Sequence, residues 1–531
     1  MRVLTTTLDL TSEKAQHNRA AMLERLAELH EQQGLARDGG GAAAVDRHRR
    51  RGKLLARERI ELLLDPDAPF LELSTVAAWG TEYPVGASVV TGIGVVSGIE
   101  CILIAHDPTV RGGASNPYTW KKVLRATQIA RENRLPVVNL VESAGGDLRH
   151  QAELFVPAGR LFHDLSALSA AGVPTIALVF GNSTAGGAYV PGMCDYTVMV
   201  AGGAKVFLGG PPLVKMATGE EADDESLGGG EMHARTSGLA DYLAADEHEC
   251  IAIGREILQH LNWRKPGGPT SPPDEPVYDP EDLLAVISAD IRVPFDPREV
   301  LGRVVDGSRF EEYKPLYGPA LVTGWAAVHG FPIGVVANHH GILFNREAKK
   351  GTEFIQLCNQ SNTPLLFLQN TTGFMVGTQY EQDGIIKDGA KMINAVTNST
   401  VPHLTINMAA SYGAGNYGMS GRSYDPRMLF SWPGSKTAVM GPEQLAGVMS
   451  IVARQSAAAA GRAFDEAEDA RRRDELAARI ESESLALYMS GRGHDDGIID
   501  PRDTRTVLGI ALSACYSAEV RGSRAFGVFR M

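Results

Sequence analysis

Two glycine-rich segments contain the residues whose types and order best suit chemistry. STAGGAYV (183–190) follows the apolar run VPTIALV (173–179), and SYGAGNYG (411–418) follows VPHLTI (401–406). Each apolar run predicts a buried strand, and glycine after it permits a positive φ and a close approach of the backbone to a ligand. If a helix begins just after each bend, its first N–H groups have no internal partner. Such groups could stabilise an oxyanion by roughly 3–4 kcal/mol per donor.

The two segments belong to an internal duplication. Gly187 and Gly415 are 228 positions apart, and upstream TGIGVVSG (91–98) corresponds to TGWAAVHG (323–330) at a separation of 232. A lone Gly-Gly pair would be better explained by a tight turn that needs glycine for packing, but a second glycine-rich bend in a repeated context favours two similar domains. Further pairs that are 228 positions apart are Pro136 and Pro364, Gly145 and Gly373, Pro174 and Pro402, and Lys121-Lys122 and Lys349-Lys350.

Side chains offer weaker candidates for catalysis. No G-x-S-x-G motif is present, and neither Ser183 nor Ser411 has a recognisable histidine partner. The pair His339-His340 is expected to point to opposite faces of a strand, which does not suit a metal site. The acidic pairs Asp223-Asp224 and Asp495-Asp496 are expected to be solvated in loops. The sequence therefore favours main-chain donors as the catalytic groups.

Composition narrows the class of protein. The net charge of −12 over 531 residues disfavours a nucleic-acid partner, and 44% hydrophobic with 21% charged residues is ordinary for a globular chain. Five cysteines without a C-x-x-C pair disfavour a zinc ribbon and a disulfide framework. No signal peptide or membrane-spanning run is recognisable, so we expect a cytoplasmic protein.

Alternating apolar strands and helix-like segments predict an α/β fold. The proline-rich stretch 263–282 is the predicted junction, which gives an N-terminal helical extension (1–45), an N-terminal domain (46–268) and a C-terminal domain (269–531). The basic start of the helix predicted at 47–67 could meet phosphates of a nucleotide-like ligand, or be a solvated helix start or a subunit contact. The other predicted helices span 10–31, 120–132, 158–171, 389–398 and 455–489.

Several longer motifs together identify a family. The chain resembles the carboxyltransferase β subunit of biotin-dependent acyl-CoA carboxylases, closest to the 3-methylcrotonyl-CoA and geranyl-CoA carboxylase branch. The resemblance implies two tandem crotonase-like (ClpP/crotonase) domains of repeated ββα units. The motifs are RGKLLARERIELLLD, NPYTWKK, STAGGAYVPGMCDY, FLGGPPLVKMATGE, GILFNREAKKGTEFIQLC, FLQNTTGFMVG, SYGAGNYGMSGRSYDPR and DDGIIDPRDTRTVLG.

The resemblance implies a role for each bend. Carboxybiotin loses CO2, the resulting ureido anion takes a proton from the acyl-CoA, and the enolate attacks CO2. In this family each bend forms an oxyanion hole, a pair of main-chain N–H groups that bind a negatively charged oxygen. The first oxyanion hole binds the thioester oxygen, by position through the N–H groups of Gly186 and Gly187. The second binds the biotin ureido oxygen, through Ala414 and Gly415. Further candidates for contact with CoA or biotin are Arg57, Ala185, Tyr189, Phe374, Gly413 and Tyr417.

The resemblance also implies partners. No biotin-attachment motif or ATP-grasp signature is present, so a biotin carboxylase/biotin carboxyl carrier (α) subunit must supply carboxybiotin, and we expect no metal in this chain. Acyl-CoA on the N-terminal domain of one subunit and biotin on the C-terminal domain of another imply at least a homodimer, usually extended to a hexamer.

The acyl group is left open by departures from the family pattern. GMSGRSYDPR (418–427) and MGPEQLA (440–446) differ from the usual methylcrotonyl motifs. 3-Methylcrotonyl-CoA is the first choice, and another branched, unsaturated or longer acyl-CoA is the alternative. A decarboxylase-linked or transcarboxylase subunit would run the same half-reaction in reverse. A non-catalytic scaffold subunit is the remaining alternative. The glycines at both bends argue against it, because a scaffold would not need backbone without side chains at these positions.

Overall fold

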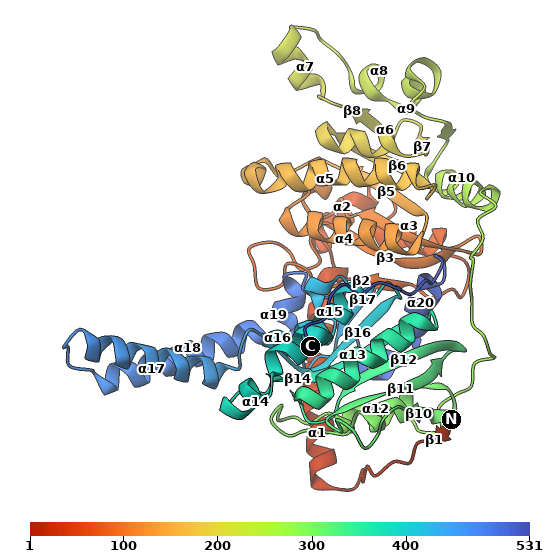
Figure 1. Cartoon of the computed structure of the whole chain (residues 1–531). Helices are drawn as coiled ribbons and strands as arrows, with labels where there is room; N and C mark the ends of the chain where they lie inside the picture. The colour runs from red at the N-terminus through yellow and green to blue at the C-terminus, as the bar shows by residue number, and fades with distance from the viewer.

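Two eight-stranded sheets organise the chain, in a computed structural model that describes residues 1–531 (Figure 1). In the first sheet the strand order is β2-β3-β4-β5-β6-β7-β9, with β8 also paired to β6. Strands β4 to β7 run parallel, so their carboxyl ends share one edge. These strands are β2 (Leu71–Leu73), β3 (Val89–Val96), β4 (Ile99–His106), β5 (Val137–Ser143), β6 (Thr175–Thr184), β7 (Tyr196–Val200), β8 (Lys205–Phe207) and β9 (Tyr242–Ala244).

The second sheet repeats this plan in the order β1-β10-β11-β12-β14-β16-β17, with β18 paired to β16. Even an irregularity is duplicated: the register shifts between Val141 and Ser143 in β5, and between Gln369 and Thr371 in β14. The strands are β1 (Arg2–Val3), β10 (Arg309–Glu312), β11 (Leu321–Val328), β12 (Phe331–Asn338), β14 (Leu365–Thr371), β16 (His403–Tyr412), β17 (Met428–Ser431) and β18 (Lys436–Ala438), with β13 (Ile342–Leu343) and β15 (Gly373–Phe374) forming a separate pair. The predicted α/β fold of repeated ββα units is therefore confirmed.

Helices α4 and α5 pack together beside the first sheet. Asn116 caps α4 by accepting hydrogen bonds from the N–H groups of Tyr118 and Thr119. Helix α5 begins earlier than the predicted residue 158, because Pro157 lies inside the helix rather than at its start. The helices are α2 (Ala42–Arg49), α3 (Ala56–Leu63), α4 (Pro117–Asn133), α5 (Gln151–Ala170), α6 (Tyr189–Met193), α7 (Pro211–Thr218), α8 (Asp224–Gly228), α9 (Gly230–Met232) and α10 (Glu247–His260).

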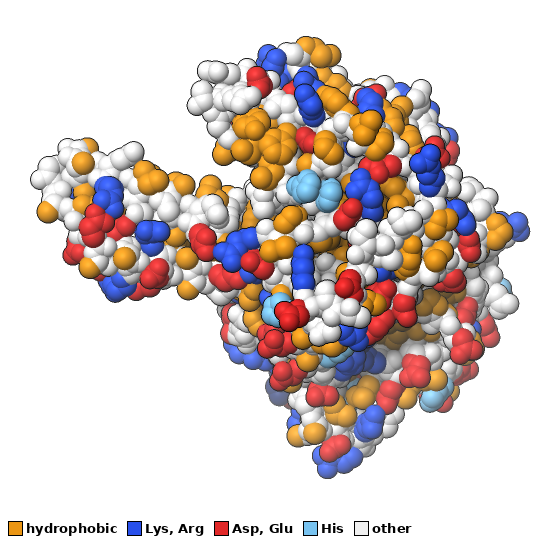
Figure 2. Space-filling view, turned by 90° about the horizontal axis from the view of Figure 1, so that it is seen from below, with side chains coloured by type: hydrophobic (Ala, Val, Ile, Leu, Met, Phe, Trp, Pro, Cys, Tyr) orange, Lys and Arg blue, Asp and Glu red, His pale blue; other side chains and the backbone are white.

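In the second half, α13 and α15 correspond to α4 and α5. The single helix predicted at 455–489 is wrong: α17 and α18 form an antiparallel pair, joined by a turn with Gly461 at φ +62° and capped by Asp465. This arm projects from the body in Figures 1 and 2. The helices are α11 (Leu283–Val286), α12 (Pro297–Val304), α13 (Asn345–Gln360), α14 (Thr378–Gln382), α15 (Ile385–Asn398), α16 (Gly413–Gly418), α17 (Pro442–Ala459), α18 (Glu466–Ser484), α19 (Ala486–Gly491) and α20 (Thr504–Cys515).

The N-terminal extension packs on the second half of the chain. Strand β1 pairs with β10, and α1 (Glu13–Arg37) packs on α11, where Asn18 hydrogen-bonds to the carbonyl of Ala285 and the N–H of Ala289. The single helix predicted at 47–67 is two helices, α2 and α3. Between them Lys53 turns inward and donates to Glu142.

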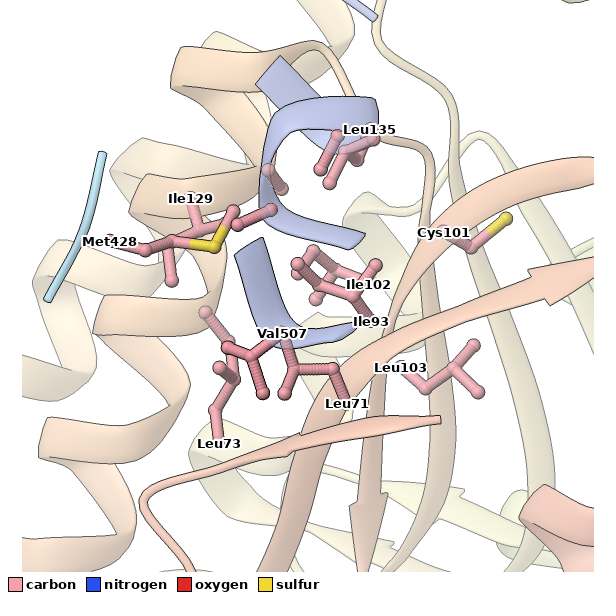
Figure 3. Close-up of a cluster of buried hydrophobic side chains, with 14 of the residues drawn as sticks. Leu71, Leu73, Ile93, Cys101, Ile102, Leu103, Ile129, Leu135, Met428 and Val507 are labelled. Carbon is pink, nitrogen blue, oxygen red and sulfur yellow. The ribbon is translucent and has the colours of Figure 1, made fainter. Parts of the chain in front are cut away.

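The main hydrophobic core crosses between the two halves. Figure 3 shows Leu71 and Leu73 of the first sheet close to Val507 of α20, and Ile129 of α4 close to Met428 of β17. The linker between α10 and α11 is irregular and largely exposed, as the proline-rich composition predicted. The division at 268/269 stays a prediction, because the core itself gives no boundary.

Candidate active site

The first glycine-rich bend directly follows β6. A 3₁₀ turn (Ala185–Ala188) continues into α6, and no side chain accepts a hydrogen bond from the N–H groups of Gly186 and Gly187 in this turn. Ser183 stabilises the turn by donating from Oγ to the carbonyl of Gly187 at 2.9 Å. The bend therefore places two adjacent main-chain donors at the carboxyl end of a central strand.

The second bend has the same construction. Helix α16 begins directly after β16, and no side chain accepts a hydrogen bond from the N–H groups of Ala414 and Gly415 in its first turn. Beneath it, Asn416 donates from Nδ2 to Ser411 Oγ at 2.6 Å, and Ser411 donates to Gln369. Neither Ser183 nor Ser411 bonds a histidine, so both serines support the backbone.

The positive φ lies one residue earlier than the Gly-Gly pairs suggested. Ala185 has φ +55° and the corresponding Gly413 has φ +54°, whereas Gly186 and Gly187 do not have positive φ. An alanine in this region is a strained conformation that clusters at functional sites. A Cβ on Gly187 would lie 3.5 Å from Ser183 Oγ, an ordinary contact. On Gly415 it would lie 2.6 Å from Thr371 Oγ1, so packing alone explains glycine at 415 but not at 187.

A cavity of about 610 Å³ opens beside the first bend. Ala185, Gly186 and Gly187 form part of its wall. Its other walls come from β4, β5, α4 and α5, so it runs across the carboxyl ends of three neighbouring strands. Strand spacing of about 4.8 Å makes that width roughly 10 Å. The apolar lining residues are Ile104, Trp120, Val123, Leu148, Ala152, Leu154, Phe155, Ala158, Leu161, Ala185 and Val190.

His106 is a polar group in this cavity that the sequence analysis missed. It ends β4, its Nδ1 is buried without a hydrogen-bond partner, and burial lowers its pKa to about 4. The imidazole is therefore neutral at pH 7. The lining residues from 148 to 155 were also missed, because Pro157 concealed the first turns of α5. A periodicity search extended through that proline would have found them.

A second cavity, of about 450 Å³, lies beside the second bend. Gly413 and Tyr417 line it, together with the strand β18 and the helix α18. Ala414 is exposed and Gly415 is buried, and neither lines this cavity. The second bend thus combines the main-chain amides of a helix start with an adjacent cavity.

The other predicted contact residues lie elsewhere. Tyr189 is 46% exposed and packs on Phe162, outside the first cavity. Phe374 packs against Gly389 and Gly418 at the edge of a smaller hydrophobic cluster in the second half of the chain. Arg57 lines neither cavity, since both its terminal nitrogens bond Glu72. Their assignment to CoA or biotin stays a prediction.

Two expectations about side-chain pairs are wrong. The rings of His339 and His340 stack with centroids 4.0 Å apart instead of pointing apart, because they lie in a bend after β12. Asp495 and Asp496 are buried rather than solvated. Burial raises the pKa of Asp495 to about 6, while Arg125 and Arg422 outweigh burial at Asp496 and lower its pKa to about 2. Asp223 is exposed as expected and caps α8.

Comparison with known proteins places these features in a family. The family described as carboxyl transferase domain matches residues 47–529. A probable biotin-dependent acyl-coenzyme A carboxylase beta2 subunit of Mycobacterium tuberculosis is 60% identical over 529 residues, covering 100% of both chains. The mitochondrial methylcrotonoyl-CoA carboxylase beta chain of Dictyostelium discoideum is 46% identical over 537 residues, covering 100% of this chain and 91% of its own.

A solved structure agrees with these relatives. The geranyl-CoA carboxylase beta subunit of P. aeruginosa has a TM-score of 0.91 and 43% identity, over 99% of each chain. No helix in the present structure is both long and apolar enough to cross a bilayer.

Proposed function

The chain belongs to the carboxyl transferase family, as a β subunit of the biotin-dependent acyl-CoA carboxylases, and from that premise we propose which of its groups perform the transfer. The N–H groups of Gly186 and Gly187 bind the thioester oxygen of acyl-CoA, and those of Ala414 and Gly415 bind the ureido oxygen of biotin. The supporting observation is that each pair of amides lies in the first helical turn after a strand, where no side chain accepts a hydrogen bond from it.

At the first bend the proposed chemistry is stabilisation of an enolate. Removal of the proton beside the thioester moves negative charge onto its oxygen, where two fixed donors act most strongly. The neighbouring cavity is mainly apolar, so it can bind the acyl chain and exclude water from the reacting carbon. His106 is neutral and contributes no charge to that cavity.

The residues at the second bend fit a biotin ring. Ala414 is exposed, and Tyr417, Val439 and Met440 offer apolar surface in the neighbouring cavity. Carboxylated biotin, when bound there, supplies the carboxyl group and accepts the proton. The chain contributes the orientation of the ureido oxygen and the adjacent hollow. A biotin carboxylase/carrier partner must bring the group to this bend.

We propose that the active unit is at least a homodimer. The two bends follow strands of different sheets, so one chain does not unite them at one sheet edge. The arm formed by α17 and α18 also exposes Val448, Met449, Ile451 and Val452, apolar surface that a second subunit would cover. A hexamer remains the prediction from family resemblance.

For the acyl group, 3-methylcrotonyl-CoA is the first candidate. A benzene-sized ligand fills a cavity of about 150 Å³, whereas the cavity here measures about 610 Å³ and is roughly 10 Å wide at the strand edge. This space favours a second candidate, a longer branched or unsaturated acyl-CoA. Carbon–carbon bonds of about 1.5 Å mean that at least about seven bonds in line are needed to cross it.

The test is to co-purify the chain with its biotinylated partner and to measure ATP-dependent bicarbonate fixation across acyl-CoAs of increasing length. We expect turnover with branched unsaturated acyl-CoAs and none with the partner alone. A complex that fixes no bicarbonate with any acyl-CoA, yet releases CO2 from a carboxylated acyl-CoA, would favour the decarboxylase direction. Absence of both reactions in an intact complex would favour the scaffold.

A further inference from the structure

A strongly basic pocket lies between the two halves and shares no lining residue with the cavity beside either bend. It has a volume of about 630 Å³ and is walled by α4, α5 and the segment after α19. Seven lysine and arginine side chains line it, against two carboxylates, Asp164 and Asp495. The chain as a whole has a net charge of −12, so this concentration of positive charge is local.

The carboxylates present do not neutralise these cations. Asp164 is shared by Arg160 at 2.9 Å and Arg131 at 3.8 Å. Asp496, just behind the pocket, is shared by Arg125 at 2.7 Å and Arg422 at 3.0 Å. Each carboxylate therefore serves two guanidinium groups.

Lys121 and Arg492 have no carboxylate partner. Lys121 donates to the main-chain carbonyl of Arg492 at 3.1 Å. Arg492 donates to the carbonyl of Trp79 at 3.0 Å and lies 3.4 Å above the centre of the Tyr488 ring. Burial and the charge of Arg492 both lower the pKa of Lys121, as expected for cations held together. Both side chains are therefore held in place by neutral partners, and their positive charges are not neutralised by a carboxylate.

The duplication supplies an internal comparison. Lys349 occupies in α13 the position that Lys121 has in α4, and Asp388 occupies in α15 the position that Arg160 has in α5. In the second half Lys349 Nζ lies 3.2 Å from Asp388, which also pairs with Lys391. In the first half an arginine replaces that aspartate. The charge that balances the lysine in one copy is thus reversed in the other.

We propose that this pocket binds a phosphate-bearing anion. Guanidinium and ammonium groups match phosphate oxygens in charge and donor geometry. Two sources share this chemistry, the phosphates of the CoA substrate and a free phosphorylated metabolite. The site is separate from the carboxyl-transfer groups proposed above, so its test needs no carboxylation reaction.

The experiment is calorimetric titration of the full-length chain with inorganic pyrophosphate and with adenosine 3′,5′-bisphosphate. We expect one site per chain, with an affinity that falls as salt is raised. The double variant Lys121→Gln/Arg160→Gln removes two exposed charges, and it should weaken binding at least about tenfold. Lys349→Gln, which removes a charge already paired with Asp388, should leave binding within about twofold. Unchanged thermal unfolding midpoints would show that the variants are folded.

Competition identifies the source of the anion. If pyrophosphate and CoA exclude one another, the phosphates of CoA occupy the pocket, and if both bind together the ligand is a separate anion. Either result supports the site. Failure of the wild-type chain to bind either probe would overturn it. Equal affinity in the double variant, or equal loss in Lys349→Gln, would also overturn it.

Discussion

Replacing Gly187 by valine tests the first bend most directly. A Cβ at this position meets only Ser183 Oγ, at 3.5 Å, so the fold can accept the side chain. Gly187 and Ser183 both line the cavity beside the first bend, which we call the acyl cavity. Valine would add two methyl groups there, beside the N–H groups of Gly186 and Gly187. If the thioester oxygen loses one donor, the cost is roughly 3–4 kcal/mol. This corresponds to a fall in kcat of about 10²–10³.

The assay is bicarbonate fixation by the chain with its biotinylated partner, with kcat and KM measured separately. Gly192→Val is the matched control, because it adds the same side chain to α6, the short helix that directly follows the turn, where a Cβ meets nothing within 4 Å and does not line the cavity. We expect the control to keep near wild-type turnover. Thermal unfolding and size-exclusion chromatography must show both variants folded and assembled. Wild-type kcat in a folded Gly187→Val enzyme would refute the assignment.

Four further changes test packing, charge and the acyl cavity. Gly415→Ala should lower the free energy of unfolding by about 1–3 kcal/mol, since its Cβ would lie 2.6 Å from Thr371 Oγ1. Asp495→Asn should raise the free energy of unfolding at pH 8 by about 2–3 kcal/mol and have no effect near pH 4. Because the pKa of Asp495 is about 6 in the folded protein, ionisation of this carboxyl destabilises the folded state above pH 6. This destabilisation disappears as the pH falls to 3.8, the ordinary pKa of aspartate. Arg125→Met should lower the free energy of unfolding by about 3 kcal/mol, because only Arg422 would still pair with buried Asp496. Ala158→Phe should narrow the acyl cavity and reduce kcat/KM for long acyl-CoAs more than for short ones.

Chemical denaturation at several pH values checks the first three, and an acyl-CoA panel checks the fourth. A Gly415→Ala chain as stable as wild type would contradict the packing argument. A pH-independent effect of Asp495→Asn would contradict the raised pKa. Equal losses for short and long acyl-CoAs in Ala158→Phe would show that the cavity does not hold the acyl chain.

Local sequence patterns predicted the central strands, the repeat and the family of this protein. The apolar runs before 183 and 411 predicted the two strands, and the 228-residue repeat predicted two equivalent units. The motifs around Gly186, Gly187, Ala414 and Gly415 predicted the family. These features depend on residues close in the chain, where side-chain periodicity and glycine geometry act directly.

Contacts between distant residues decided the rest. The sequence predicted solvated Asp495 and Asp496, but Arg125, from the other half of the chain, makes a buried position possible for Asp496. Nothing local showed that β1 and α1 pack on the second half, or that α5 lines a cavity with β4. Arg160 and Asp388 occupy equivalent positions in the repeat, yet only folding set Arg131 beside Asp164 and Lys121 beside Arg492. Burial and charge at a site depend on the neighbours that the fold supplies, and those neighbours lie far away in the chain.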